Sequence, residues 1–318
     1  MSDDRLVIAL DVGGTKLSIG LITMSGELLW QRTTTTVQST VGDSLDQIIM
    51  LIEEAAANVS NEHAIASIGM AVPGWVNHRD ETVWAPNIKG WDHIPLKAEL
   101  QRRVSWPIKI DADRHAYVLG EAWCGSAAGL DDVIFLAVGT GIGAGIISGG
   151  HLIRGRHDLA GCVGWLAVQP DFRARYAQVG CLEAEAAGRS VARKAEGCGF
   201  FDDYSSESER SARVVIEAAE QENAVACAIL DEVARFLGMG VANLINILNP
   251  EMVVLGGGLF QQGDYLITAL CEETRRWAQP IAMPRTRIAR SLLGENAGLF
   301  GAAYLTLDSV RKKIERYQ

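Results

Sequence analysis

Two passages of the sequence repeat one arrangement, and this repeat restricts the possible folds more than any other feature. Residues 7–26 run from an apolar strand through a Gly-Gly-Thr turn into a second strand and a further glycine turn. Residues 133–150 follow the same order around a Gly-Thr-Gly turn. Strand, glycine turn and strand predict a β-hairpin, and two such hairpins, each opening a run of strands and helices, predict a duplicated fold. The alternative is a chance likeness of two glycine-rich hairpins.

The rest of the chain alternates strands and helices. The spacing of apolar residues predicts helices over 44–57, 95–104, 114–123, 211–219, 222–246, 265–277 and 297–316. Apolar runs predict strands at 28–30, 65–72, 108–110 and 252–255, and a short one near Ile288. Asp43 or Ser44 is the expected N-cap of the first helix, and residues 84–91 are expected to form a loop. This alternation favours an α/β fold, and the 48% of apolar residues suffices for its core.

Charge and cysteine usage narrow the class of protein. The formal net charge is −10, so nucleic acid is not an expected partner, because its binding depends on neutralising phosphates. The six cysteines form no C-x-x-C pair, which predicts neither a zinc ribbon nor a redox dithiol and favours reduced thiols and a cytoplasmic location. The most apolar stretch, residues 133–147, is interrupted by glycines and too short to cross a bilayer, so we expect no membrane segment.

Three glycine-rich turns, each following an apolar strand, predict phosphate binding. They are Gly13-Gly14-Thr15, Gly139-Thr140-Gly141 and Gly256-Gly257-Gly258. Glycine permits positive φ and close approach to bare backbone N–H groups, which together with a threonine hydroxyl suit phosphate oxygens. Neither the P-loop nor the dinucleotide-binding fingerprint fits, because the first two turns continue into strands rather than helices. The alternative is that the glycines serve only tight turns and close strand packing.

Two aspartates that follow strands are candidate acid–base groups. Asp11 ends the first strand beside a glycine turn, and Asp113 follows the strand at 108–110 and opens a helix. A carboxylate can accept a hydroxyl proton or organise Mg²⁺, and phosphoryl transfer uses both roles. The alternatives are an N-cap for Asp113 and a turn residue for Asp11. Asp111, two residues before Asp113, is a competing candidate for the base.

Taken together, these residues resemble the ROK family of sugar kinases, within the sugar kinase–Hsp70–actin superfamily. The likeness extends in order over nearly the whole chain. The motifs that carry it are Asp11-Val12-Gly13-Gly14-Thr15-Lys16, Ala71-Val72-Pro73-Gly74, Asn87-Ile88-Lys89-Gly90-Trp91, Asp113 with Leu119-Gly120-Glu121, Val138 to Gly145, Gly180-Cys181-Leu182-Glu183, Leu255-Gly256-Gly257-Gly258 and the final helix from Ala297.

The resemblance implies an α/β fold of duplicated actin-like (ribonuclease H-like) domains with a cleft between them. The smaller domain would comprise residues 1–118 plus 297–318, and the larger one residues 119–296. The cofactors implied are ATP and Mg²⁺, the substrate is a sugar, and a homodimer is expected by analogy.

The resemblance also assigns site residues through the matching motifs. ATP and its phosphates would bind at Asp11, Gly13, Gly14, Thr15, Lys16, Gly139, Thr140, Gly141, Gly256 and Gly257. The sugar would bind at Gly74, Asn87, Asp113 and Glu183. Asp113 would be the general base, and Asp11 would act on Mg²⁺ directly or through its waters.

Departures from the family pattern affect a sugar contact and the zinc motif. Cys162 stands where the family has a glutamate that holds sugar hydroxyls, and Trp165 where it has a zinc-binding histidine. Ala174 and Tyr176 replace the first two cysteines of the zinc motif, and only Cys181 remains. One thiolate cannot build a four-ligand site, so we expect no structural zinc. Trp165 is expected to fill the volume of the lost cluster; stacking on a sugar ring is the alternative.

Further departures flank the predicted base. Ala112 and His115 replace the two asparagines of that motif. Losing several hydrogen bonds of about 1–3 kcal/mol each would weaken binding of an ordinary aldohexose by on the order of 10²–10⁴. The neighbouring Arg114, His115, Arg156, His157 and Asp158 could therefore contact an acidic, amino or otherwise modified sugar; the alternative is that they are surface loop residues.

The sequence thus predicts ATP-dependent phosphorylation of a hydroxyl of a hexose or hexose derivative, as in glucokinases and N-acetylhexosamine kinases. The main alternative is a non-catalytic sensor of sugar or nucleotide. ROK repressors carry an N-terminal helix-turn-helix, whereas the phosphate hairpin here begins close to residue 1, so such a sensor is expected to act through a protein partner. A phosphohydrolase of the same superfamily is a third possibility.

Overall fold

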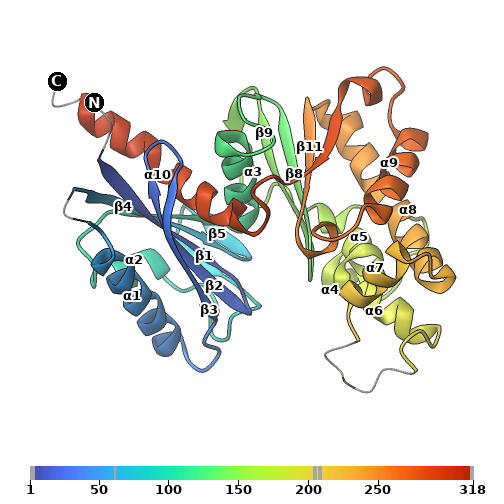
Figure 1. The fold of residues 1–318 in the computed structure, drawn as a ribbon, viewed down its shortest axis with the longest axis horizontal. Helices are drawn as coiled ribbons and strands as arrows, with labels where there is room; N and C mark the ends of the chain where they lie inside the picture. Colours follow the sequence, from blue (N-terminus) through green and yellow to red (C-terminus); the bar gives the residue numbers. More distant parts are fainter. Residues whose placement is uncertain (1–3, 61, 203–205, 207–209, 316–318) are drawn as a thin grey trace. The chain divides into compact units, whose positions relative to one another are not determined.

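The computed structural model describes residues 4–60, 62–202, 206 and 210–315 (Figure 1). The chain divides into two compact units, each described here by itself. The first unit comprises Met1–Gly129, Leu152–Ala160 and Glu295–Gln318, and the second comprises Leu130–His151 and Gly161–Gly294. The domain boundary expected between residues 118 and 119 falls inside a helix that lies wholly in the first unit.

The first unit is built on a five-stranded sheet of order β3-β2-β1-β4-β7. The strands are β1 (Arg5–Val12), β2 (Lys16–Thr23), β3 (Leu28–Thr35), β4 (Ala64–Val72) and β7 (Ile108–Ala112). β1 to β3 are paired antiparallel, whereas β4 pairs in parallel with both β1 and β7. A small antiparallel hairpin, β5 (Trp75–Asn77) and β6 (Thr82–Trp84), follows β4.

Helices cover both faces of this sheet. α1 (Val41–Ala57) and α2 (Leu96–Gln101) lie on one side, and α3 (Asp113–Cys124) and α10 (Ala297–Glu315) lie on the other (Figure 1). This explains why β1 reads as a continuous apolar run, since five consecutive residues of it are fully buried. Arg316, the last residue of the expected final helix, lies outside the described residues.

The second unit repeats this topology. Its sheet has the order β10-β9-β8-β11-β12. The strands are β8 (Val133–Val138), β9 (Ile142–Ser148), β10 (His151–Leu152), β11 (Met252–Gly256) and β12 (Arg287–Arg290). β8 and β9 form an antiparallel hairpin, and β8, β11 and β12 are parallel. Each unit thus joins a glycine-turned hairpin to two further parallel strands, which confirms the predicted duplicated α/β fold.

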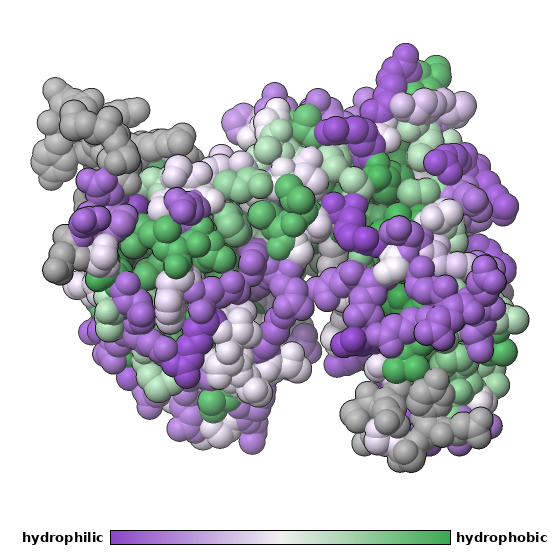
Figure 2. Space-filling model, viewed as in Figure 1, coloured by the Kyte–Doolittle hydropathy of each residue, from purple (hydrophilic) through white to green (hydrophobic). Residues whose placement is uncertain are grey.

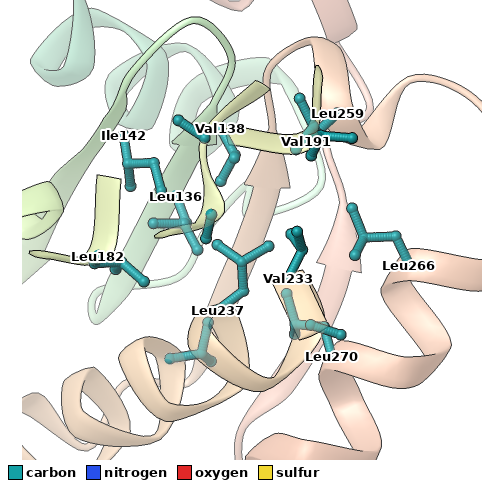
Figure 3. Packing of buried hydrophobic residues seen from close by; sticks show 14 of the residues in the cluster. Leu136, Val138, Ile142, Leu182, Val191, Val233, Leu237, Leu259, Leu266 and Leu270 are labelled. Carbon is teal, nitrogen blue, oxygen red and sulfur yellow. The ribbon is translucent and has the colours of Figure 1, made fainter. Parts of the chain in front are cut away.

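A long helix organises the core of the second unit. The helices are α4 (Tyr176–Val179), α5 (Cys181–Ala186), α6 (Gly188–Gly197), α7 (Ala212–Glu220), α8 (Ala224–Leu248) and α9 (Tyr265–Trp277). Val233 and Leu237 of α8 pack among Leu136 of β8, Leu182 of α5 and Leu270 of α9 (Figure 3). The helical spacing of buried residues along α8 produces this face.

Two local sequence-based expectations were wrong. The first helix begins at Val41, and its N-cap is Thr40, whose Oγ1 accepts a hydrogen bond from the backbone N–H of Asp43 at 3.1 Å. The expected cap residues therefore lie within the first turns of the helix. The hairpin β5–β6 was not foreseen, because three-residue strands carry too little periodicity to be recognised.

Close packing between α3 and α10 depends on glycines. A Cβ on Gly301 would lie 1.7 Å from the backbone oxygen of Ala116, and one on Gly120 would lie 2.4 Å from the backbone oxygen of Ala297. Real Cβ atoms do not approach oxygen so closely, so any side chain at these positions must push the helices apart. This contact joins α3, which begins at Asp113, to α10, whose first residues lie against Asp11.

A buried carboxylate holds α5 to the segment before α4. Glu185 is 1% exposed and accepts a hydrogen bond from the Tyr176 hydroxyl. It also forms ion pairs with Arg175, with Arg173 at 3.2 Å and with Lys194 at 3.6 Å. Burial alone would raise the pKa of Glu185, but Tyr176 and Arg175 outweigh burial and lower it. Removing these partners is costly, because it would leave the buried charge of Glu185 poorly solvated.

Polar and charged residues cover much of the face seen in Figure 2, interrupted by apolar patches. Within the described part of the chain, no helix is both long and apolar enough to cross a membrane.

We expect Gly301→Ala to destabilise the first unit by about 2 kcal/mol, because the added methyl group must displace α3. Thermal unfolding followed by circular dichroism measures the effect. Gly197→Ala is the matched control, since that glycine is also helical and a Cβ there meets no atom within 4 Å. Equal unfolding temperatures for the two variants would contradict this view of the packing.

We expect Glu185→Gln to lower the free energy of unfolding by about 2 kcal/mol, because the hydrogen bonds from Tyr176 and Arg175 then reach a neutral amide instead of a buried carboxylate. Glu217→Gln, which removes an exposed ion pair with Arg213, should change it by less than about 0.5 kcal/mol. Urea denaturation compares the two; similar midpoints would show that the Glu185 cluster does not stabilise the unit.

Candidate active site

The turn between β1 and β2 is shaped by hydrogen bonds to its carbonyl groups. The backbone N–H of Gly13 donates to the oxygen of Lys16 at 2.9 Å, and that of Thr36 donates to the oxygen of Thr15 at 3.0 Å. The Thr36 hydroxyl donates to the oxygen of Gly13 at 2.7 Å. The Lys16 ammonium pairs with Glu295 at 2.6 Å in an exposed position, and such a pair is weak enough for a phosphate to compete with it.

The predicted sugar-binding loop lies against this turn. A Cβ on Gly14 would lie 2.8 Å from the backbone oxygen of Asn87. The side-chain amide of Gln38 donates to the backbone oxygens of both residues, at 3.2 Å for Asn87, and its oxygen accepts from the N–H of Lys89 at 2.9 Å. The first unit therefore brings one predicted phosphate turn and one predicted sugar loop together.

Asp11 and Asp113 meet at one edge of the first sheet. β1 and β7 both run parallel to β4, so the carboxyl ends of the three strands share an edge. Burial, then the charge of Asp113, raises the pKa of Asp11 to about 7, against the opposing effect of Lys16. Burial also raises the pKa of Asp113. Tyr117 lies close to both carboxylates, since burial and then their two charges raise its pKa well above the usual value.

Neither Asp113 nor Asp11 has the purely structural role considered as its alternative, which was an N-cap for Asp113 and a turn residue for Asp11. The N-cap of α3 is Ala112, so Asp113 is not the N-cap; its Oδ1 accepts only from the adjacent N–H of Arg114, at 2.7 Å, among the hydrogen bonds described. Asp11 is not a turn residue, because it pairs within β1. Its Oδ2 lies 2.1 Å from where a Cβ on Gly298 would be, so the carboxylate contacts the start of α10.

Asp111 has the opposite surroundings. Its Oδ1 accepts from His115 Nδ1 at 2.7 Å and lies 3.4 Å from His78 Nε2, and its Oδ2 accepts from Arg154 Nε and Nη2 at 2.9 and 2.6 Å. Burial raises the pKa of Asp111, but the bonds from His115 and His78 and the charge of Arg154 outweigh burial and lower it. A saturated carboxylate with a lowered pKa is a poor base, which favours Asp113 over Asp111.

Gly74 lies in the turn that joins β4 to β5. Its φ is +86°, and a Cβ would lie 2.2 Å from the backbone oxygen of Trp84, so a residue other than glycine is strained there on both counts. Its own carbonyl oxygen accepts a hydrogen bond from Arg114 Nη1 at 2.8 Å. Gly74 and the start of α3, where Asp113 lies, are thus joined directly.

The second unit brings the other two glycine turns together. The N–H of Gly139 donates to the oxygen of Gly141 at 3.0 Å, and Gly139 in turn accepts from the N–H of Gly188 at 2.8 Å. Gly257 has a φ of +89°, and a Cβ on it would lie 2.5 Å from the backbone oxygen of Val138. The turn at 256–258 therefore packs on the hairpin that carries Thr140.

Glu183, predicted to bind the sugar, lies at this second phosphate turn. Its Oε2 accepts the backbone N–H of Ile142 at 2.7 Å and lies 2.8 Å from where a Cβ on Gly141 would be. Burial raises the pKa of Glu183, while the bond from Ile142 lowers it less. The carboxylate thus holds the first residue of β9, next to the turn.

The expectation that Trp165 fills a space left by a lost zinc cluster was wrong. Trp165 is 57% exposed, and Cys162 is exposed as well. Tyr176, which is 4% exposed, occupies the interior instead and bonds to Glu185. No group of three or more His, Cys, Asp or Glu side chains is placed to hold a metal ion among the residues that the structure describes.

The residues beside the predicted base divide into two sets. Arg114 and His115 are 6% and 1% exposed, so describing them as surface loop residues was wrong. Arg156 and His157 are exposed. Sequence reasoning missed the Glu185 cluster and the pairing of Asp111 with Arg154, because ion pairs between distant segments leave no periodic signal in a single sequence.

Comparison with known proteins gives independent evidence of the family to which this chain belongs. The ROK family model matches residues 7–309. A glucokinase from Halalkalibacterium halodurans is 30% identical over 95% of this chain and 95% of its own length. A xylose repressor from Caldicellulosiruptor bescii is 31% identical over 96% of this chain and 78% of its own length.

Among solved structures, a ROK family glucokinase from Streptomyces griseus in complex with glucose and AMPPNP is 32% identical. It superposes with a TM-score of 0.79 and covers 94% of this chain and 98% of its own. The match of the family model over nearly the whole chain, together with these likenesses in sequence and fold, shows that the chain belongs to the ROK family.

Proposed function

We propose that this protein transfers the γ-phosphoryl group of ATP to a hydroxyl of a hexose or hexose derivative, with Asp113 as the general base. The observation that carries the proposal is the contrast between carboxylates in the first unit. Asp113 lies beside Asp11 with a raised pKa, whereas Asp111 is saturated by hydrogen bonds. The glucokinase relatives and the complex of one of them with glucose and AMPPNP support the same reaction.

In the proposed reaction Asp113 accepts the proton of the sugar hydroxyl as its oxygen attacks the γ-phosphorus. The new oxygen–phosphorus bond forms while the bond to the β,γ-bridging oxygen breaks, and ADP leaves. Little covalent chemistry falls to the protein in such a transfer, so catalysis depends mostly on positioning and charge stabilisation. A base with a raised pKa suits this role, because it holds the proton that it accepts more firmly than an ordinary carboxylate does.

The glycine turns are proposed to bind the nucleotide's phosphates. In the first unit the candidates are Gly13, Gly14, Thr15 and Lys16. In the second unit they are Gly139, Thr140, Gly141, Gly256 and Gly257. The hydrogen bonds that hold the first turn use its carbonyl oxygens and the N–H of Gly13, which is compatible with a phosphate at the N–H groups of Gly14 and Thr15. Gly74, Asn87 and Glu183 remain the proposed sugar contacts.

Magnesium fits the chemistry of the first unit. Mg²⁺ is usually held by one or two carboxylates together with substrate phosphates rather than by a full protein cage. Asp11 is such a carboxylate, and it is held in surroundings that disfavour its charged form. Bound there with Asp11, directly or through water, the ion would supply neutralising charge for the phosphates.

A non-catalytic sensor of sugar or nucleotide is the second candidate, and the likeness to a xylose repressor favours it. Retained ATP binding without sugar-dependent ADP release would support the sensor. The homodimer, the cytoplasmic location, the domain ranges and the cleft remain predictions.

We expect Asp113→Asn to lower kcat at least 10²-fold, because the amide cannot accept the hydroxyl proton. A coupled assay of ADP release over a panel of hexoses, amino hexoses and N-acetylhexosamines measures it. Asp46→Asn, on the exposed face of α1, is the control and should behave as the unmodified protein. Sugar-dependent ADP release that survives Asp113→Asn would exclude this residue as the base.

The raised pKa of Asp11 makes stability depend on pH. Its pKa of about 7 exceeds the unfolded value of 3.8, so between about pH 4 and 7 the folded state keeps a proton that the unfolded state releases, and the contribution of Asp11 to stability falls as pH rises. We expect Asp11→Asn to raise the free energy of unfolding by on the order of 2 kcal/mol at pH 8 and to change it little at pH 4.5. Urea denaturation at both pH values tests this; an effect that is independent of pH would contradict it.

A further inference from the structure

The guanidinium of Arg114 binds three backbone carbonyls at once. Nη1 donates to the oxygen of Gly74 at 2.8 Å, Nη2 to that of Asp158 at 2.9 Å and Nε to that of Ala160 at 3.0 Å. The side chain is 6% exposed. A buried guanidinium needs such partners, and its planar fork can serve three acceptors that a lysine ammonium, at the end of a flexible stem, cannot reach together.

These three acceptors belong to two segments that lie far apart in the sequence. Gly74 lies in the turn after β4, while Asp158 and Ala160 end the segment 152–160, which belongs to the first unit. Further contacts join the same two segments: Trp75 Nε1 donates to the oxygen of His157 at 2.8 Å, and the N–H of His78 donates to Asp158 Oδ2 at 3.1 Å.

Segment 152–160 is also bound by a residue that precedes Asp113 in the sequence. Asp111 binds Arg154 of this segment through two hydrogen bonds and binds His115 of α3 through a third. The two residues that hold the segment, Asp111 and Arg114, therefore flank Asp113 in the sequence. The segment and the Gly74 turn are therefore bonded to residues on both sides of Asp113.

We propose that Arg114 is a positioning residue for Asp113: it locks the Gly74 turn and segment 152–160 onto the start of α3, so that the base keeps a fixed place relative to the turn proposed to bind the sugar. This inference rests on the proposed function. A displacement of about 1 Å in such a group can lower the rate of a transfer about 10²-fold, because little other than positioning drives the reaction. The positive charge of Arg114 has a separate effect, since it favours the ionised form of Asp113.

Two substitutions separate position from charge. Arg114→Lys keeps the charge but cannot reach all three carbonyls, and we expect kcat to fall at least tenfold while the pH at which activity is half-maximal stays unchanged. Arg114→Met also removes the charge, so we expect a similar fall in kcat and a shift of the acidic limb of the pH–rate profile toward higher pH. KM for the sugar should change less than kcat in both variants.

Arg193→Lys is the control, because Arg193 also donates to a backbone carbonyl, that of Ala184 at 2.9 Å, but lies in the second unit. Its kcat and pH profile should stay within about twofold of the unmodified protein. Unfolding temperatures of all variants are measured alongside. If Arg114→Met fails to fold, Trp75→Phe tests the same segment, since it removes the bond to His157 while keeping an aromatic ring beside His93, and a severalfold fall in kcat is expected.

The outcomes are distinguishable. An unmodified protein without sugar-dependent ADP release would overturn the proposed function itself. If the unmodified protein is active, a kcat within twofold in the folded Arg114→Lys variant, or a change confined to KM, would overturn the positioning role. A fall in kcat of Arg114→Lys with an unshifted pH profile supports it.

Discussion

The burial of two neighbouring carboxylates, Asp11 and Asp113, is the constraint on which the first unit depends. Asp11 and Asp113 end up together because β1 and β7 run parallel on either side of β4, so the chain leaves both strands at one edge. This arrangement disfavours folding, and it is held by packing elsewhere, above all the contact of α3 with α10 that Gly120 and Gly301 permit. Without such packing, local movement of the chain would expose or separate the two carboxylates, and their pKa values would return toward the usual range.

Asp111 shows how closely function depends on the partners of a side chain rather than on its type. It lies two residues before Asp113 and exposes only 1% of its surface, yet its pKa moves in the opposite direction because two histidines and Arg154 bond to its carboxylate. Asp111 is therefore a structural residue that binds several side chains, whereas Asp113 accepts a single hydrogen bond among those described. This structural residue and the candidate base are thus parts of one arrangement.

The sequence predicted most of what depends on local pattern. The two hairpins, the alternation of strands and helices and the long helix α8 all follow from periodicity and glycine turns, and the observed topology repeats as expected. The N-cap at Thr40 was missed because several polar residues precede the first apolar position. The hairpin β5–β6 was too short to register. The Glu185 cluster and the bonds of Arg114 could not be foreseen, because they join residues whose distance in sequence follows no rule.

The departures from the family pattern leave Asp11 and Asp113 in place and fall on residues around them and in the zinc motif. Asp11, Asp113 and the glycine turns keep the family motifs, while Arg114 and His115 stand beside the proposed base and Tyr176 stands in the former zinc motif. Each of these three residues is tied into the structure: Arg114 through three carbonyls, His115 through Asp111, and Tyr176 through Glu185. Hydrogen bonds and buried ion pairs thus hold the loops around the base and the segment before α5. Because these bonds fix backbone rather than contact a phosphate, variation at these positions is expected to affect the proposed transfer through the placement of Asp113 and its neighbouring loops rather than through the binding of the phosphates.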